Sequence, residues 1–260
     1  RKVMGKKQRD EIPKQRIMFT EGAIKNGIDK SVAEAIFDQM EKFASYGFNK
    51  SHAAAYSLIS YQTAYLKAHY PVEFMCAVMS LDITNTEKLL IYKEECKKMG
   101  FEVLKPDINK SGADFAVENG NIRYALGAIK GVGAANMQAI EDERKAHGPY
   151  KDLSDFIHRT DIKQINRRQM EQLSKAGAFD CLDKSRGKIF ANIETIMQHI
   201  AAASELKTSS QASLFGTEEL HTTVKLADKP DWPELEKLKL EAEAIGFYLS
   251  AHPLDSYARG

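Results

Sequence analysis

The sequence contains few of the residues on which small secreted folds and zinc-binding modules depend. Its 260 residues include three cysteines, Cys76, Cys96 and Cys181, which lie far apart, and no Cys-x-x-Cys pair is present. This spacing favours neither a disulfide-stabilised scaffold nor a zinc finger, and it is typical of a chain in the reducing cytoplasm. No apolar run approaches the roughly 18 residues that span a bilayer, so we expect no membrane partner.

Motifs typical of several enzyme classes are also missing. The sequence has no Walker loop, no Gly-x-Ser-x-Gly, no His-Glu-x-x-His and no Asp-x-Asp. Two-metal phosphoryl transfer needs carboxylates held close together, and the histidines show no spacing typical of metal ligands. We therefore predict no catalytic residue, no metal site and no bound cofactor in this chain. The first residue is arginine, and we expect the chain to be a piece of a longer polypeptide.

Charge is nearly balanced overall but uneven along the sequence. The formal net charge is +1, so overall charge indicates neither a nucleic acid nor a membrane as partner. Residues 1–16 carry seven basic side chains against two acidic ones, whereas residues 205–260 carry six basic side chains against ten acidic ones. This asymmetry indicates an anionic ligand near the first residues.

The spacing of apolar residues predicts a mainly α fold with a short β excursion. Apolar residues recur at intervals of three and four from Val32 to Phe43, and a second helix is expected from Ser51 to about His69, before a proline. Further helices are predicted near 72–81, 85–99 and 234–245, short strands within 101–125, and short helices within 126–203. Residues 204–233 are rich in serine and threonine and are expected to form a linker.

The helix that begins near Ser51 is apolar on nearly all of its faces. Alanine, leucine and isoleucine occupy many of its positions, so we expect it to be buried. Tyr56, Tyr61 and Tyr65 follow one another at spacings of five and four. We expect these three rings to pack in the core rather than to stack on bases.

The first candidate site combines the basic residues that open the chain with the turn that opens this helix. Gly5 lets the backbone approach a ligand closely, and the first turn of a helix offers unpaired N–H groups and a positive dipole end to a phosphate. The alternative is a solvated basic surface beside an ordinary serine cap. The candidate residues are Arg1, Lys2, Lys6, Lys7, Lys50, Ser51 and His52.

The second candidate site is a glycine-rich turn between two short helices, within 127–140. The pattern is typical of a helix-hairpin-helix motif, in which the backbone amides of Gly131, Gly133 and Ala134 face a DNA phosphate and Lys130 adds charge. Such contacts hold a duplex without reading its bases. The small core of the motif would consist of Ile129, Val132 and Ile140.

A possible second copy of this motif lies at 166–179. Arg167, Arg168 and Lys175 would supply its positive charge, and it has one glycine where the hairpin prefers two. For both copies the alternative is a helix turn that ends at a glycine.

The third candidate site is a short apolar pair inside the predicted linker. Leu214 and Phe215 follow Gln211 in an otherwise polar stretch, and an exposed apolar pair of this kind is typical of a docking peptide. The alternative is that the pair pins the linker to its own domain.

These motifs are similar to the C family of bacterial replicative DNA polymerases, the alpha subunits of DNA polymerase III. The resemblance covers essentially the whole chain, and the most specific matches are Phe48–Gln62 and Leu66–Met75. The matching segments keep the order of the family and are 1–7, 48–63, 66–75, 106–109, 127–133, 176–180 and 211–215.

The resemblance implies a division of the chain into four parts. These are the C-terminal part of the fingers domain (1–105), a helix-hairpin-helix DNA-binding domain with short β segments (106–203), a linker with a clamp-binding motif (204–233), and the entry to a truncated OB-fold domain (234–260).

The resemblance also implies roles for the candidate residues. In the family the basic fingers segment and the histidine of the Lys-Ser-His turn approach the triphosphate of the incoming dNTP. The resemblance therefore assigns Arg1, Lys2 and His52 to that contact. The other residues of the first candidate site would be their neighbours. Lys2 stands where many members have arginine, so the charge is kept but bidentate geometry is lost. The residues that match the motif docking in the hydrophobic cleft of the sliding clamp are Gln211, Ser213, Leu214 and Phe215.

The implied partners are primer–template DNA, dNTP, the sliding clamp (the beta subunit) and other replicase subunits. The three catalytic aspartates of the family, which hold Mg²⁺, belong to a palm domain expected before Arg1, so the chain alone is predicted to be inactive. The alternative function is a non-enzymatic helix-hairpin-helix adapter that binds DNA and docks on a clamp. Such an adapter has no use for a phosphate site around His52.

Overall fold

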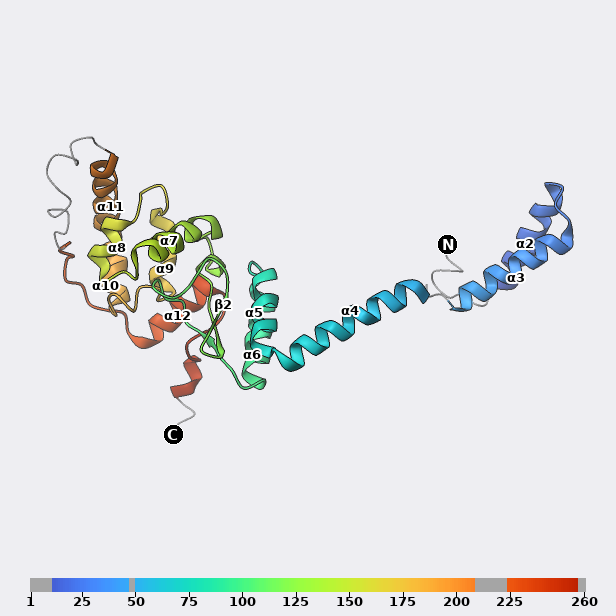
Figure 1. The fold of residues 1–260 in the computed structure, drawn as a ribbon, viewed down its shortest axis with the longest axis horizontal. Coiled ribbons are helices and arrows are strands. Elements are labelled where there is room, and N and C mark those ends of the chain that lie inside the picture. Colours follow the sequence, from blue (N-terminus) through green and yellow to red (C-terminus); the bar gives the residue numbers. More distant parts are fainter. Residues whose placement is uncertain (1–10, 47–49, 209–223, 257–260) are drawn as a thin grey trace. The chain divides into compact units, whose positions relative to one another are not determined.

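The computed structural model describes residues 11–46, 50–208 and 224–256, and the chain is mainly helical with one small sheet, as predicted (Figure 1). The chain divides between Tyr65 and Leu66 into two compact units. That division falls within a single helix, α4 (Lys50–His69). The domain boundaries expected from the sequence stay predictions.

The first unit contains a pair of helices joined by a tight turn. Helix α2 (Ile12–Lys25) has a proline in its first turn, where the missing N–H costs nothing, and it packs on α3 (Lys30–Tyr46). Arg16 of α2 pairs with Asp38 and Glu41 of α3, and the buried residues Ala33 and Phe37 lie on the same helix. The periodicity that predicted a helix from Val32 onward is confirmed.

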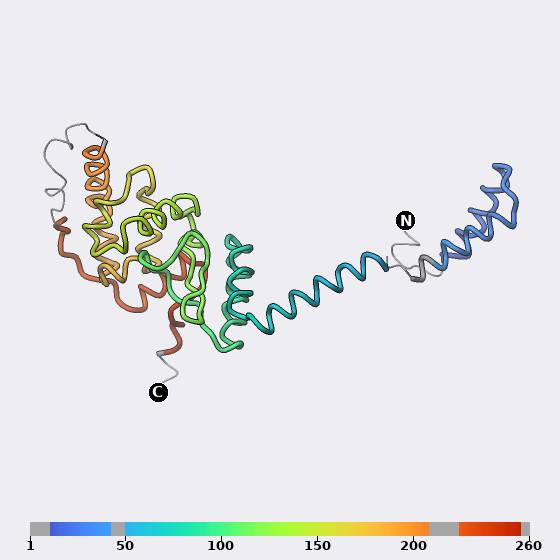
Figure 2. Tube along the Cα trace, viewed as in Figure 1, coloured from blue at the N-terminus to red at the C-terminus, as the bar shows by residue number. Residues whose placement is uncertain are grey.

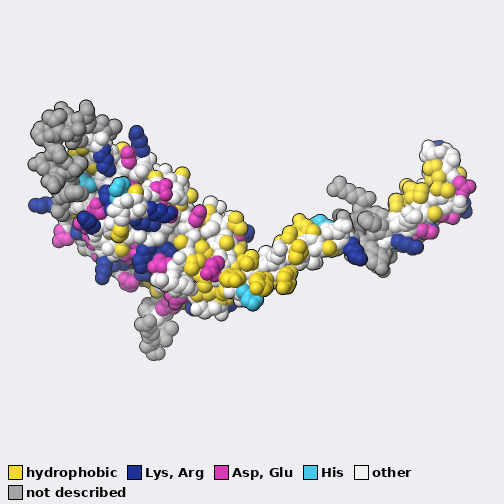
Figure 3. Space-filling model, in the orientation of Figure 1, with side chains coloured by type: hydrophobic (Ala, Val, Ile, Leu, Met, Phe, Trp, Pro, Cys, Tyr) yellow, Lys and Arg dark blue, Asp and Glu magenta, His cyan; other side chains and the backbone are white. Residues whose placement is uncertain are grey.

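Helix α4 has the bounds expected from the sequence, but its predicted burial is wrong. None of its residues is buried, and Tyr56, Tyr61 and Tyr65 are 57%, 67% and 47% exposed. Figure 3 shows apolar side chains along this helix. An apolar helix becomes a core helix only when other chain segments cover it.

The second unit begins with two helices that share one apolar interface. Pro71 starts α5 (Pro71–Leu81), and the side chain of Asn85 caps α6 (Thr86–Lys98) by accepting the Lys88 N–H at 3.1 Å. The two helices predicted near 72–81 and 85–99 are thereby confirmed. Their buried residues are Met75, Cys76, Met79, Leu89 and Cys96.

The β excursion forms a three-stranded sheet in the order β1-β3-β2. Strand β1 (Val103–Leu104) runs parallel to β3 (Asn121–Arg123), and β2 (Ala116–Glu118) pairs with β3 in the antiparallel sense. The β2–β3 turn has positive φ at Asn119 and Gly120, residue types that accept this conformation readily. Arg123 donates to both carboxylate oxygens of Glu118, which fixes the hairpin by a bidentate pair.

Short helical elements follow the sheet and complete the second unit. Helix α9 (Arg167–Lys175) lies against α10 (Arg186–Ala191), α11 (Ile193–Thr208) and α12 (Glu234–Ile245), so segments distant in sequence meet around it (Figure 2). Their common core includes the buried rings of Tyr124, Phe156 and Phe179. The bounds are η2 Leu126–Ala128, α7 Ala134–His147, α8 Leu153–Arg159, α9 Arg167–Lys175, α10 Arg186–Ala191, α11 Ile193–Thr208, α12 Glu234–Ile245 and η5 Pro253–Ser256.

The predicted linker at 204–233 is partly ordered on the second unit. Residues 204–208 belong to α11, because the helical pattern continues past the expected end. Residues 224–232 have no regular structure but are held in place: Val224 N–H donates to Ser154 Oγ at 3.0 Å, and Ala227 exchanges two hydrogen bonds with the Asn192 amide. Residues 209–223 lie outside the described residues.

Candidate nucleic-acid interface

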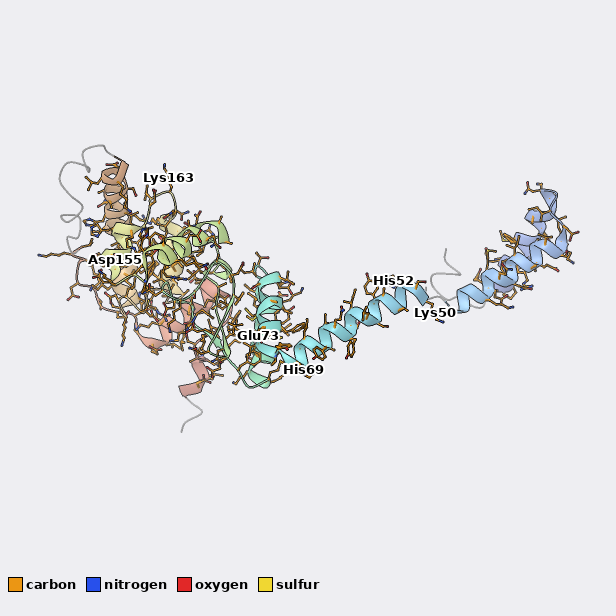
Figure 4. The ribbon with its side chains drawn as sticks, viewed as in Figure 1. Lys50, His52, His69, Glu73, Asp155 and Lys163 are labelled. Carbon is orange, nitrogen blue, oxygen red and sulfur yellow. The ribbon has the colours of Figure 1, made fainter. Side chains whose placement is uncertain are left out.

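The candidate phosphate site at the start of α4 is described only in part. Arg1, Lys2, Lys6 and Lys7 lie outside the described residues. Lys50, Ser51 and His52 form the first turn of α4 and are exposed, and the first turn holds no acidic side chain (Figure 4). The ring of His52 stacks on Tyr56, with 4.2 Å between the ring centroids.

The clamp-binding candidates also lie outside the described residues. These residues are Gln211, Ser213, Leu214 and Phe215. The described flanks both meet α8 or its end: Lys207 Nζ donates to the Arg159 carbonyl at 3.1 Å, and Val224 N–H donates to Ser154 Oγ at 3.0 Å. The segment between them therefore starts and finishes beside the same helix.

The second candidate site is a tight turn between η2 and α7, and its predicted core is confirmed. Gly131 and Gly133 have φ of 76° and 83°, a region that favours glycine, and both are exposed. The first helix of the motif is a single 3₁₀ turn rather than an α-helix. The core residues Ile129, Val132 and Ile140 are each 1% exposed.

Three backbone amides at this turn have no acceptor among the described residues. The N–H groups of Gly131, Gly133 and Ala134 donate no hydrogen bond to any described residue. Gly133 caps α7 without a side-chain partner, and the first turn of α7 holds no acidic residue. A helix start with open amides and no competing carboxylate suits an anion such as a phosphate.

Two basic residues, Lys130 and Arg168, belong to this turn or lie against it. Lys130 is exposed in the turn itself. Arg168 of α9 lies over Gly131, such that a β-carbon at Gly131 would sit 3.2 Å from Arg168 Nε. The structure therefore brings together residues from the two regions that the sequence analysis singled out separately.

Arg167 differs from its neighbour Arg168. Its guanidinium pairs with Glu171 and Glu194, each at 3.0 Å, on the surface of the second unit. Arg168 therefore is the member of the pair that borders the hairpin.

The possible second copy of the motif has a different turn. Gly177 also has positive φ, at 77°, but it is buried under the Arg186 guanidinium, and its N–H donates to the Ser174 carbonyl at 3.1 Å. Burial disfavours the charged form of Arg186, but hydrogen bonds to Asp180 and Glu241 outweigh this and raise its pKa. The turn after α9 therefore has a structural role. Its Gly177 N–H already has an acceptor and is not open to a phosphate.

The hairpin is held from two sides by residues that the sequence analysis did not select. The Lys130 N–H donates to the Ala244 carbonyl at the end of α12, at 2.9 Å, and Gln169 Nε2 of α9 donates to the Val132 carbonyl. The Asn-x-x-Gln pattern from Asn166 to Gln169 predicts a capping box, which the structure contains. Nothing local in the sequence predicts the contact of Gln169 with Val132.

The described ranges contain neither a cluster of metal-binding side chains nor a helix that could span a membrane. Among those residues no group of three or more His, Cys, Asp or Glu could hold a metal ion. No helix in the same ranges is long and apolar enough to cross a membrane.

Comparison with known proteins gives matches over the whole chain. A helix-hairpin-helix motif family model matches residues 100–189, which include the hairpin and α9. The chain is 44% identical over 255 residues to DNA polymerase III subunit alpha of Caulobacter vibrioides, which covers 98% of this chain and 22% of that protein. The proteins of the same name from Vibrio cholerae and Escherichia coli K12 are 47% and 44% identical over the full chain, and the match covers 23% of each. The chain thus spans less than a quarter of the length of these relatives.

Proposed function

We propose that this chain, which is homologous over its full length to one segment of DNA polymerase III alpha subunits, acts in template-directed DNA synthesis as part of such a subunit. The observation that carries the proposal is the hairpin, where the open amides of Gly131, Gly133 and Ala134 lie beside Lys130 and Arg168. A similarity that extends over the whole chain favours this function over a separate DNA-binding adapter.

The hairpin would hold the duplex by its backbone. Amides at a helix start and two nearby cations provide hydrogen bonds and charge for phosphates, but they offer nothing to the base edges. We therefore expect binding that does not depend on DNA sequence and that weakens steeply as salt increases, because bound cations displace counterions from the phosphates.

The experiment is to measure the affinity of the chain for a short blunt-ended DNA duplex between about 50 and 200 mM salt. Lys130→Ala should weaken binding and reduce the salt slope by about 1. The matched control is Lys225→Ala, an exposed lysine on the segment that packs against α8, which should leave both quantities unchanged. A salt-independent affinity, or equal effects of the two substitutions, would contradict the DNA contact.

The start of α4 and the basic residues before it would contact the phosphates of the incoming dNTP. Lys50, Ser51 and His52 support this by their exposure in a first turn without acidic side chains. Arg1, Lys2, Lys6 and Lys7 complete the proposed set. His52→Ala in the full-length polymerase should raise the KM for dNTP, with clamp affinity unchanged as the control, and an unchanged KM would reject this assignment.

The peptide with Gln211, Ser213, Leu214 and Phe215 would dock in the apolar cleft of a sliding clamp. Its support is the position of the described flanks, which tie Lys207 and Val224 to the second unit. Tethering to a clamp would raise the effective concentration of the enzyme at the primer end.

The chemistry itself would reside elsewhere in the subunit. We expect the metal-binding carboxylates and their Mg²⁺ to belong to a palm domain outside this chain, so that the chain alone lacks polymerase activity. Other replicase subunits are further proposed partners, and the cytoplasm is the proposed location.

A further inference from the structure

Gln169 is a buried polar residue whose side-chain amide forms hydrogen bonds through both its oxygen and its nitrogen. It is 5% exposed and lies in the first turn of α9. Its Oε1 accepts the Asn166 N–H at 2.9 Å, and its Nε2 donates to the carbonyl of Val132 in the hairpin. A buried amide with both ends bonded is rigidly placed, because leaving either end without a partner would cost free energy.

These partners also fix which way the amide faces. A backbone N–H can only donate, so the atom opposite Asn166 must be the oxygen of the Gln169 amide. The nitrogen must then face the Val132 carbonyl, which can only accept. The donor at the hairpin therefore follows from the chemistry of the two partners.

The bond to Val132 determines the direction of the next amide in the chain. A trans peptide unit is planar, with its C=O and N–H on opposite sides, and the described residues contain no cis peptide bond. Because Gln169 holds the Val132 oxygen on the side of α9, the N–H of Gly133 faces the opposite side. That N–H donates to no described residue, and Gly133 is exposed.

No other described side chain hydrogen-bonds to the backbone of residues 130–134. The remaining bonds are Lys130 N–H to Ala244 and Val132 N–H to Ile129, and neither constrains the peptide that precedes α7. Gly133, which follows this peptide bond, accepts a wide range of φ values, so the glycine does little to fix the orientation of the peptide. Its orientation depends on Gln169.

We infer that Gln169 is a positioning residue for the DNA contact: by holding the Val132 carbonyl, it aims the Gly133 N–H at the phosphate. The inference rests on the proposed function, in which the hairpin binds the DNA backbone. In this inference Gln169 does not itself contact the DNA. It determines the direction of the Gly133 N–H in the hairpin.

The test is Gln169→Met in the 260-residue chain, measured by the affinity for the same short duplex across the salt range. Methionine is similar in length and apolar, and it removes the donor to Val132. Affinity should fall about three- to tenfold at every salt concentration, the loss expected for one misplaced hydrogen bond. The salt slope should stay unchanged because no cation is removed, whereas Lys130→Ala lowers the slope.

Two controls separate positioning from stability. Asn166→Ala weakens the cap of α9 but leaves the Gln169 donor in place, so it should lower the Tm without changing the affinity. Gln198→Met makes the same substitution at an exposed position of α11 and should change neither. If the methionine variant fails to fold, Gln169→Leu replaces it, because leucine also has neither a charge nor a donor for Val132.

Three results would overturn the inference that Gln169 positions the hairpin. Equal affinity of the Gln169 variant and the parent chain would overturn the inference and leave the proposed DNA contact intact. An equal loss in Asn166→Ala would also overturn it, because the effect would then come from α9 as a whole. A parent chain that fails to bind duplex rejects the proposed DNA contact, and the inference with it.

Discussion

Arg186 Nη1 lies 3.4 Å from Glu241 Oε2, and both residues are almost completely buried, at 5% and 1% exposure. The same guanidinium forms a bidentate pair with Asp180. Glu241 in turn accepts the N–H groups of Leu249 and Ser250. This network joins the turn after α9, helix α10, helix α12 and the residues that follow α12.

Arg186→Met should destabilise the second unit by about 3–5 kcal/mol, because it leaves the buried Glu241 carboxylate without a cation. Urea unfolding followed by the fluorescence of Trp232 measures this, since the single tryptophan packs on Phe190 of α10. The matched control is Arg167→Met, whose ion pairs are exposed and should contribute less than about 1 kcal/mol. Equal losses in the two variants would show that the buried network does not stabilise the fold.

The pair of Glu118 with Arg123 should make the β2–β3 hairpin acid-sensitive. The Arg123 guanidinium lowers the pKa of Glu118 from 4.5 to about 2. A carboxyl whose pKa is lower in the folded state stabilises the fold above its unfolded pKa, and that stabilisation disappears as pH falls from about 4.5 to about 2. The contribution at neutral pH is at most about 3 kcal/mol.

Thermal unfolding of the parent chain and of Glu118→Gln across this pH range measures that contribution. The two Tm values should differ most near neutral pH and converge as the pH approaches 2. A difference that does not depend on pH would mean that the carboxylate charge is unimportant at this position.

The open amide of Ala134 can be removed without breaking its helix. Ala134 is the first residue of α7, a position where proline is favoured, and the ψ of 131° at Gly133 is compatible with a following proline. Ala134→Pro should therefore weaken duplex binding about three- to tenfold at unchanged Tm. Ala134→Ser, which keeps the N–H, serves as the control, and similar affinities for the two variants would exclude a phosphate contact at this amide.

The clamp peptide can be tested within this chain. We expect the chain to bind its cognate sliding clamp with a Kd of about micromolar or tighter, and the double substitution Leu214→Ala/Phe215→Ala to abolish binding, because two adjacent apolar anchors supply most of the contact. Leu206→Ala, at an exposed leucine of α11, should bind like the parent. Retained binding by the double variant would place the clamp contact elsewhere.

The sequence was informative wherever structure depends on neighbours along the chain. The ends of α5, α6 and α12 follow from a proline, an asparagine cap and a terminal glycine, all visible in the sequence. The hairpin core was predictable for the same reason, since Ile129, Val132 and the following helix lie within one short motif.

Long-range packing explains what the sequence could not provide. The apolar composition of α4 predicted burial, but composition does not say whether a covering segment lies within the same chain. The bond from Gln169 to Val132 joins residues 37 positions apart, and no periodicity encodes it. The turn itself is therefore predictable from neighbouring residues, whereas Arg168 and Gln169 reach it only through long-range packing.

Helix α12 ends at Gly246, whose φ is 105° and which has no room for a side chain, because a β-carbon there would lie 2.8 Å from Thr86 and 3.1 Å from Lys130. Two residues earlier, the Ala244 carbonyl accepts the Lys130 N–H. The end of α12 therefore contacts the hairpin directly, through the Ala244 carbonyl and through the close approach of Lys130 to Gly246. A displacement of α12 would therefore be passed on to the hairpin through the hydrogen bond between the Ala244 carbonyl and the Lys130 N–H.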